Sequence, residues 1–306
     1  MELPILHNEP LSKHTIFQIG GPARYFFRVK NYVDLKEIVQ WAQQHEVPLA
    51  VLGGGSNVLA SDKGFDGLVL KMEDRTIDIQ GSFINAGAGA ITAMVSKLTV
   101  EAGLSGLEWA YGIPGTIGGA VRGNAGAFGG SFSDIVSLVE MLDPKTLEIH
   151  RVTGEGMQFQ YRRSMLANTP WIVTYAILKM DVSTPEMCKE RMQEFLDQKK
   201  TNQPLGMQCA GCAFKNVPVA SITKSIELPV EFLQTGRVPA GYLVDKAKMK
   251  NHVCGRAMVS PKHANFIVNL GGATAMDVVE LMKIIKDRVY QEFGVVLEEE
   301  IQYIGF

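Results

Sequence analysis

Residues 103–130 read Gly103-Leu-Ser-Gly-Leu-Glu-Trp-Ala-Tyr-Gly-Ile-Pro-Gly-Thr-Ile-Gly-Gly-Ala-Val-Arg-Gly-Asn-Ala-Gly-Ala-Phe-Gly-Gly130 and hold ten of the 31 glycines of the chain. Apolar residues separate the glycines, so the segment can pack as well as turn. Glycine adopts positive φ and lets a backbone approach a ligand closely, and successive N–H groups in such turns form nests that bind anions. Two interpretations stay open from this stretch alone: an anion-binding loop, or tight turns in an ordinary sheet protein.

The composition is that of a globular protein. The chain has 306 residues, 46% hydrophobic and 20% charged, with a net charge of −2, and this length allows two or three domains. The sequence contains no run of basic residues, so it does not indicate a nucleic-acid groove. No apolar run approaches the ~18 residues of a membrane span. The first residues lack a signal-peptide pattern. We therefore expect a cytoplasmic protein without a nucleic-acid partner. We also expect a monomer, with an oligomer as the alternative.

The cysteines give a weak signal for a metal or redox site. Cys209 and Cys212 have the C-x-x-C spacing of redox pairs and of half zinc sites. A structural zinc site needs a second ligand pair, which neither Cys188 nor Cys254 supplies. We expect no metal site, and a working dithiol stays an alternative.

Apolar periodicity predicts helices and strands in mixed order, without the strict alternation of a doubly wound sheet, which favours an α+β fold. Helices are expected over 34–46, 91–101 and 275–292, with another starting at Thr184-Pro185. Strands are expected over 49–52, 83–86, 171–182, 265–269 and 295–304. We place domain boundaries near residues 75 and 200.

A second glycine turn, Gly53-Gly54-Gly55-Ser56-Asn57, follows the strand predicted at 49–52. Its consecutive N–H groups and the donors of Ser56 and Asn57 suit a pyrophosphate. The sequence Gly87-Ala-Gly-Ala-Ile-Thr92 resembles a dinucleotide-binding fingerprint, but Thr92 replaces the third glycine, which allows close helix–strand packing. We interpret that segment as a structural turn.

Three further segments place polar groups on apolar stretches. Arg162 could bind a carboxylate in bidentate fashion, with a surface salt bridge as the alternative. Cys212 lies on a glycine turn, with a small buried cysteine as the alternative. Glu298 and Glu300 share one face of the last predicted strand, with solvated edge-strand charge as the alternative.

Together these segments resemble the UDP-N-acetylenolpyruvoylglucosamine reductase (MurB) family of flavoenzymes. The resemblance runs nearly end to end and is closest to the shorter family class, which lacks an extra loop and its tyrosine. It rests on eight motifs in order: Thr15–Ala23, Gly53–Leu59, Gly112–Gly129, Tyr161–Ser164, Ala210–Asn216, Ala240–Ala247, Lys262–Asn269 and Gly294–Gly305.

The resemblance implies an α+β fold with a two-subdomain FAD-binding unit of the vanillyl-alcohol-oxidase (PCMH) type and a smaller C-terminal α+β substrate domain. We expect FAD-binding subdomain 1 over residues 1–75, joined by a C-terminal strand at 293–306. Subdomain 2 is expected over 76–198 and the substrate domain over 199–292.

The resemblance also implies an activity, the reduction of UDP-N-acetylglucosamine enolpyruvate to UDP-N-acetylmuramate in peptidoglycan precursor synthesis. NADPH would reduce FAD, and the flavin would pass a hydride to the β-carbon of the enolpyruvyl group. Cys212, which is serine in many relatives, would protonate the α-carbon. Arg162 and Glu300 would stabilise the enediolate-like species between these steps. FAD is expected to be noncovalent because Gly53–Leu59 contains no histidine or cysteine.

The resemblance names contact residues for both ligands. The implied FAD contacts are Gly53, Gly54, Gly55, Ser56, Asn57, Ile113, Pro114, Gly115, Thr116, Gly118, Gly119, Asn124 and Gly126. The implied contacts to the UDP-sugar substrate are Tyr161, Asn216, Tyr242, Lys246 and His263.

Two other functions stay open. A flavin oxidase of the same superfamily would act on another substrate, but it would lack the set of Arg162, Cys212 and Glu300. A flavin- or sugar-nucleotide-binding protein without turnover is left open by Cys212 and by Gln302, which replaces an arginine of some relatives.

Oxidation could also trap Cys212 as a disulfide with Cys209.

Overall fold

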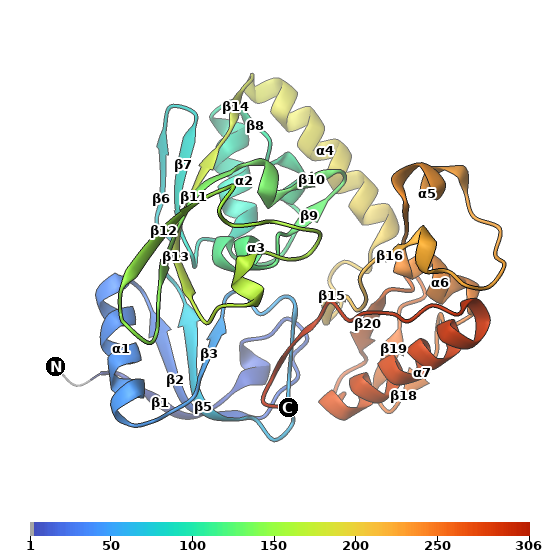
Figure 1. Cartoon of the computed structure of the whole chain (residues 1–306), viewed down its shortest axis with the longest axis horizontal. Helices are drawn as coiled ribbons and strands as arrows, with labels where there is room; N and C mark the ends of the chain where they lie inside the picture. The colour runs from blue at the N-terminus through green and yellow to red at the C-terminus, as the bar shows by residue number, and fades with distance from the viewer. Residues whose placement is uncertain (1–2) are drawn as a thin grey trace. The chain divides into compact units, whose positions relative to one another are not determined.

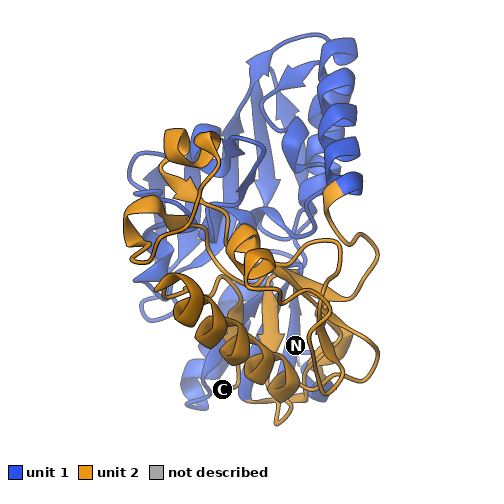
Figure 2. Cartoon of the chain, turned by 90° about the vertical axis from the view of Figure 1, so that its right-hand side faces the viewer, with its two compact units in different colours: residues 1–9, 23–54, 66–201 blue, residues 10–22, 55–65, 202–306 orange. Residues whose placement is uncertain are grey.

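The computed structural model describes residues 3–306, which form two compact units that alternate along the sequence (Figure 2). Unit 1 comprises the residues up to 9, 23–54 and 66–201, and unit 2 comprises 10–22, 55–65 and 202–306. Each unit has a hydrophobic core of its own. The three-part division expected from the sequence stays a prediction.

Unit 1 contains two larger sheets (Figure 1). The first has the strand order β1-β2-β5-β3, in which β3 is an edge strand and runs parallel to β5. The second is antiparallel throughout, with the order β12-β11-β13-β7-β6. Their strands are β1 (Leu6–Pro10), β2 (Pro22–Val29), β3 (Leu49–Leu52), β5 (Phe65–Met72), β6 (Ile77–Gln80), β7 (Phe83–Gly87), β11 (Val136–Leu142), β12 (Ile149–Thr153) and β13 (Ile172–Lys179).

The helices of unit 1 follow apolar periodicity in the sequence. Helix α1 (Tyr32–Gln44) buries Leu35, Ile38 and Val39, which belong to the same core as Phe27 of β2. The other helices are α2 (Thr92–Glu101), α3 (Ile117–Arg122) and α4 (Pro185–Asn202), and two-residue strands form the pairs β8 (Leu104–Ser105) with β14 (Asp181–Val182) and β9 (Gly126–Ala127) with β10 (Gly130–Ser131).

Unit 2 is built on a four-stranded sheet of order β15-β20-β19-β18, beside which helix α7 (Ala275–Phe293) packs. The apolar stripe of α7 includes Val278, Leu281 and Ile285, which are fully buried. The remaining elements are β4 (Val58–Ala60), β15 (Cys209–Cys212), β16 (Val217–Pro218), α5 (Val230–Thr235), β17 (Arg237–Val238), α6 (Ala240–Lys246), β18 (Val253–Cys254), β19 (Ala257–Val259), β20 (Phe266–Asn269) and β21 (Gln302–Ile304). Sheets and helices without regular alternation confirm the predicted α+β class.

The end of the chain differs from the prediction. A continuous strand was expected over 295–304, but only β21 forms, and it pairs in parallel with β4. Before β21, the chain makes an isolated antiparallel bridge between Glu299 and Phe214. Because the segment changes partner between these two contacts, no single ladder runs through it.

The glycines at the end of β7 and just after it lie in a tightly packed turn. A Cβ on Gly87 or Gly89 would lie 2.7 Å from backbone atoms of Asp74, so these glycines serve close packing, as expected for a structural turn.

Among residues 3–306, no helix has the length and apolar character needed to cross a membrane.

Candidate active site

The glycine turn after β3 lies against the second glycine-rich segment within unit 1. A Cβ on Gly54 would lie 2.7 Å from the Cα atom of Gly115, and one on Gly53 would lie 2.5 Å from Oγ1 of Thr116. Gly115 itself has a φ of 138°, which side chains disfavour. Only glycines therefore allow these two predicted FAD-contacting segments to approach so closely.

Unsatisfied hydrogen-bonding groups gather where the two segments meet. The backbone N–H groups of Gly53, Gly54, Gly115 and Gly119 donate to no acceptor in the part of the chain from 3 to 306. Within the same range, Oγ1 of Thr116 is buried without a hydrogen-bond partner. A buried polar atom without a partner costs free energy. The arrangement fits a ligand that is rich in acceptor oxygens, as a diphosphate is.

Other predicted FAD contacts in this segment are already engaged with the protein. The N–H of Gly118 donates to the carbonyl of Ala88 at 2.9 Å, and the N–H of Ile113 donates to the carbonyl of Ala110 at 2.9 Å. Their role toward FAD, like that of Pro114, stays a prediction.

Arg162 lies in a strained turn. Its φ is 56°, a left-handed conformation that is uncommon outside glycine. The flanking residues Gln160 and Arg163 exchange both backbone hydrogen bonds, at 2.9 and 3.1 Å. Nη2 of Arg162 donates to the carbonyl of Gly126 at 2.9 Å, and the guanidinium lies 5.2 Å from the ring centroid of Tyr161. The turn thus holds a permanently charged guanidinium in a defined place.

The side chain of Asn124 holds this turn through a hydrogen bond. Its Nδ2 donates to the carbonyl of Gln160 at 2.9 Å, and its Oδ1 accepts from the N–H of Ser133 at 2.9 Å. Asn124 is buried and also has a positive φ, of 42°. Its side chain therefore supports the Arg162 turn, and the predicted contact with FAD stays a prediction.

In unit 2, Cys212 and Glu300 lie on segments that pair with each other. The N–H of Glu300 donates to the carbonyl of Ala213 at 2.9 Å. Gly211, with a φ of 74°, forms an irregularity in β15 that ends at Cys212. The carboxyl end of β15 is thereby brought beside the main chain of Glu300.

Asn57 fixes the same place from the glycine turn. Its Nδ2 donates to the carbonyl of Glu300 at 3.0 Å, and its carbonyl accepts from the N–H of Gln302 at 2.9 Å. A Cβ on Gly211 would lie 4.0 Å from the carbonyl oxygen of Ser56. Unit 2 thus unites three motifs that are far apart in the sequence.

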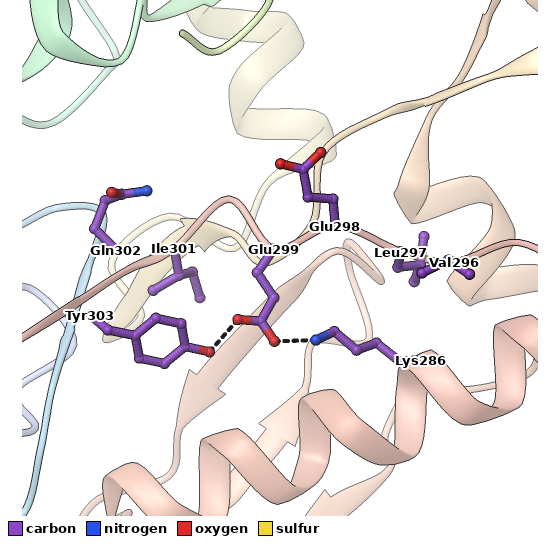
Figure 3. A pocket seen from close by; sticks show the side chains of 8 residues that line it. All are labelled: Lys286, Val296, Leu297, Glu298, Glu299, Ile301, Gln302 and Tyr303. Carbon is purple, nitrogen blue, oxygen red and sulfur yellow. Dashed lines mark hydrogen bonds and ion pairs between the residues drawn. The ribbon is translucent and has the colours of Figure 1, made fainter. Parts of the chain in front are cut away.

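The neighbours of Glu300 are held by ion pairs (Figure 3). The Glu299 carboxylate lies between Lys286 of α7 and the hydroxyl of Tyr303, which donates to it at 2.5 Å. Glu298 pairs instead with Lys215 at 2.5 Å. Burial and the neighbouring carboxylate of Glu299 raise the pKa of Tyr303. These contacts fix the main chain on the N-terminal side of Glu300.

The predicted substrate contacts of unit 2 are arranged around α6. Oδ1 of Asn216 accepts from the N–H of Ala240 at 3.2 Å, at the start of the helix. The Tyr242 hydroxyl donates to the carbonyl of Glu227 at 3.2 Å, and Nζ of Lys246 lies 5.4 Å from the Tyr242 ring centroid. Their contacts with a substrate stay predictions.

His263 lies beside the same helix. A Cβ on Gly241 would lie 3.0 Å from its ring. Its Nδ1 accepts from the N–H of Asn265 at 3.2 Å, which assigns the ring proton to Nε2 in the neutral form. Burial lowers the pKa of His263, so Nε2 can donate a hydrogen bond from a neutral ring.

Sequence reasoning missed two residues that shape the site. Asn265 is buried, and its side chain donates to the carbonyl of Phe214 at 2.8 Å and accepts from the Phe214 N–H at 3.0 Å. Lys71 donates to the carbonyl of Gly53 at 2.5 Å. A lysine near the end of an apolar strand was the available signal for Lys71, whereas nothing local distinguished Asn265.

The C-x-x-C spacing of Cys209 and Cys212 is typical of metal and redox sites. Within residues 3–306, no group of three or more histidine, cysteine or acidic side chains is placed to hold a metal ion. None of the four cysteines is in a disulfide, and trapping of Cys212 by Cys209 under oxidation stays a prediction.

Comparison with known proteins identifies both parts of the chain. Residues 203–304 match the family model described as UDP-N-acetylenolpyruvoylglucosamine reductase, C-terminal domain, and residues 23–152 match an FAD binding domain. A reductase of that name from Bacillus pumilus is 38% identical over 304 residues, which are 98% of this chain and 94% of the relative. Another, from Caldanaerobacter subterraneus subsp. tengcongensis, is 36% identical over 299 residues, 97% of this chain and 93% of the relative.

A solved structure agrees with these relatives. The UDP-N-acetylenolpyruvylglucosamine reductase (MurB) of Thermus caldophilus has a TM-score of 0.79 and 35% sequence identity, and the match covers 99% of both chains. The order of an FAD-binding part and a C-terminal part is the one expected from the eight motifs.

Proposed function

The chain belongs to the UDP-N-acetylenolpyruvoylglucosamine reductase family, and we propose that Arg162, Cys212 and Glu300 carry its reaction. It is an FAD-dependent oxidoreductase that uses NADPH to reduce UDP-N-acetylglucosamine enolpyruvate to UDP-N-acetylmuramate, an activity of peptidoglycan precursor synthesis. The observation that carries the proposal is the pairing of Glu300 with Ala213, next to Cys212.

The residues at the two glycine segments fit FAD. Gly53, Gly54, Gly115 and Gly119 offer N–H donors, and Thr116 offers a buried hydroxyl without a partner among residues 3–306. When bound, FAD supplies hydride transfer from NADPH to the β-carbon of the enolpyruvyl group. Gly53–Leu59 contains no histidine or cysteine, which supports noncovalent binding.

Arg162 is proposed to bind the carboxylate of the enolpyruvyl group. A guanidinium matches a carboxylate in bidentate geometry and keeps its charge at any working pH. Addition at the β-carbon moves negative charge onto that carboxylate. Arg162 would stabilise this charge, and Glu300 would share or donate a proton to it, since an ionised carboxylate would repel it.

Cys212 is proposed as the proton donor. A cysteine thiol with its ordinary pKa is mostly protonated at neutral pH and is a stronger acid than serine. The proton leaves Sγ for the α-carbon, completing the addition of two hydrogens across the double bond. The thiolate then regains a proton from solvent.

The test separates the two half-reactions by stopped-flow absorbance of the flavin. Cys212→Ala should be reduced by NADPH at the wild-type rate but should not be reoxidised by the enolpyruvyl substrate, whereas Cys212→Ser should retain turnover. Cys209→Ala is the matched control on the same strand, and we expect wild-type turnover. Normal reoxidation in Cys212→Ala would remove Cys212 from the mechanism.

The state of the protein in the cell is also part of the proposal. We propose a monomer that works in the cytoplasm, as expected from the sequence. Light scattering coupled to size-exclusion chromatography tests the first point, and cell fractionation tests the second. A stable dimer at working concentration would contradict the monomer.

A further inference from the structure

Lys71 occupies an unusual place at the end of β5. It pairs in register with Leu52, the last residue of the edge strand β3. Its Nζ reaches over to the carbonyl of Gly53 at 2.5 Å, so a charged side chain is attached to the first residue of the glycine turn. The half-buried side chain makes no ion pair with any carboxylate in the range 3–306.

Charged groups of both signs act on Lys71. The Glu73 carboxylate raises the pKa of Lys71, but this carboxylate is paired with Arg28 of β2 at 2.6 Å. Arg28 and Arg75 add positive charge. Burial, together with these two arginines, lowers the pKa of Lys71 to about 8, against the opposing effect of Glu73.

The Lys71 ammonium has more hydrogen-bond donors than the Gly53 carbonyl can satisfy. An ammonium has three N–H donors, and the carbonyl of Gly53 takes one of them. That bond commits the Gly53 carbonyl to Lys71, so this oxygen is not available to turn toward an anion and repel it. The neighbouring N–H groups of Gly53 and Gly54 have no acceptor among the described residues.

Resting on the proposed function, we propose that Lys71 fixes the Gly53 carbonyl and supplies the positive charge that favours the FAD diphosphate on the glycine turn. The diphosphate bears negative charge, and a partly buried ammonium close to it is screened less than a surface charge. The cost of burying Lys71 without a carboxylate is then compensated only when FAD is bound.

The proposal has a signature in pH. A bound dianion favours the ammonium, so the pKa of Lys71 must be higher in the complex than in the apoprotein. By linkage, FAD binding then takes up a proton above about pH 8, and affinity falls as pH rises through that range. With a pKa of about 8 before binding and a higher pKa after it, the dissociation constant should rise by up to about 30-fold between pH 7 and 9.5.

The experiment titrates flavin-free protein with FAD and follows quenching of flavin fluorescence at several pH values from 7 to 9.5. Lys71→Met should bind FAD about 10- to 30-fold more weakly at pH 7, with little further change at high pH. Lys71→Arg keeps its charge and should bind tightly across the range. Lys97→Met, which removes an exposed lysine of α2 that is 52% accessible, is the matched control and should follow the wild type.

The outcomes separate this inference from the proposed function. Wild-type pH dependence in Lys71→Met, or a failure of Lys71→Arg to restore affinity in a protein that melts cooperatively, would overturn the role of Lys71. Absence of FAD binding in all four proteins, the control included, would overturn the proposed function and this inference with it.

Discussion

Replacing Gly54 by alanine probes the contact between the two segments that we propose to bind FAD. The added Cβ would lie 2.7 Å from the Cα atom of Gly115, whereas ordinary contacts begin at 3.4 Å. The two glycine segments must therefore separate by about 0.7 Å, or the backbone must strain. Overpacking of this kind costs about 1–3 kcal/mol.

The proposed FAD site needs both segments in place, so strain at this contact should weaken FAD binding. Most of the cost should then appear in binding. At about 1.4 kcal/mol per factor of ten, the affinity of Gly54→Ala for FAD should fall about 10- to 100-fold, measured by fluorescence titration. Its free energy of unfolding in urea should fall by only about 1 kcal/mol.

The matched control is Gly123→Ala, at the end of α3 in the second glycine-rich segment. Its Cβ would meet only the carbonyl of Gly119, at 3.6 Å, so its affinity for FAD should remain at the wild-type value. If Gly54→Ala bound FAD as tightly as Gly123→Ala, the contact between Gly54 and Gly115 would have no part in the FAD site.

Three further predictions follow from single contacts. Thr116→Val should stabilise the apoprotein by about 1 kcal/mol, because it removes a buried hydroxyl without a partner among residues 3–306. The same substitution should weaken FAD binding. An unchanged free energy of unfolding in urea would contradict the expected stabilisation. Burial lowers the pKa of His263, so the unfolded chain takes up a proton near pH 6.5 before the folded protein does. Stability should therefore fall as pH drops below about 6.5, and His263→Gln should show a smaller fall in urea unfolding at pH 7 and 5. Glu299→Gln leaves Lys286 and Tyr303 without their carboxylate and should reduce the free energy of unfolding by about 1 kcal/mol. The control Glu101→Gln changes an ion pair in which both side chains are about half exposed, and it should change that free energy by no more than a few tenths of a kcal/mol. Equal effects of the two substitutions would contradict a special role for Glu299.

Local features of the site were accessible from the sequence. The strand at 49–52 followed by Gly53 and Gly54 was predicted and is present as β3 and its turn. The helix expected over 275–292 forms as α7, one residue longer, because its apolar stripe has the period of a helix. Glycine marks places where backbones approach closely, and the contact of Gly54 with Gly115 is such a place.

Long-range pairing limited the prediction elsewhere. The strand expected over 295–304 is mostly absent, because Glu299 bridges Phe214 while β21 pairs with β4. Neither partner is visible in the local pattern of residues, which looks like an ordinary alternating strand. The roles of Lys71 and Asn265 depend in the same way on neighbours that lie 18 and 51 residues away.

The sequence by itself determined the class of the fold and the family, because these depend on residue type and on short-range periodicity. The tertiary structure alone decided that residues 10–22 and 55–65 belong with the C-terminal part, and that Asn57, the end of β15 and Glu300 meet in one place. Such groupings follow from which buried surfaces fit together across long separations in the chain, a free-energy balance that no local pattern of residues encodes.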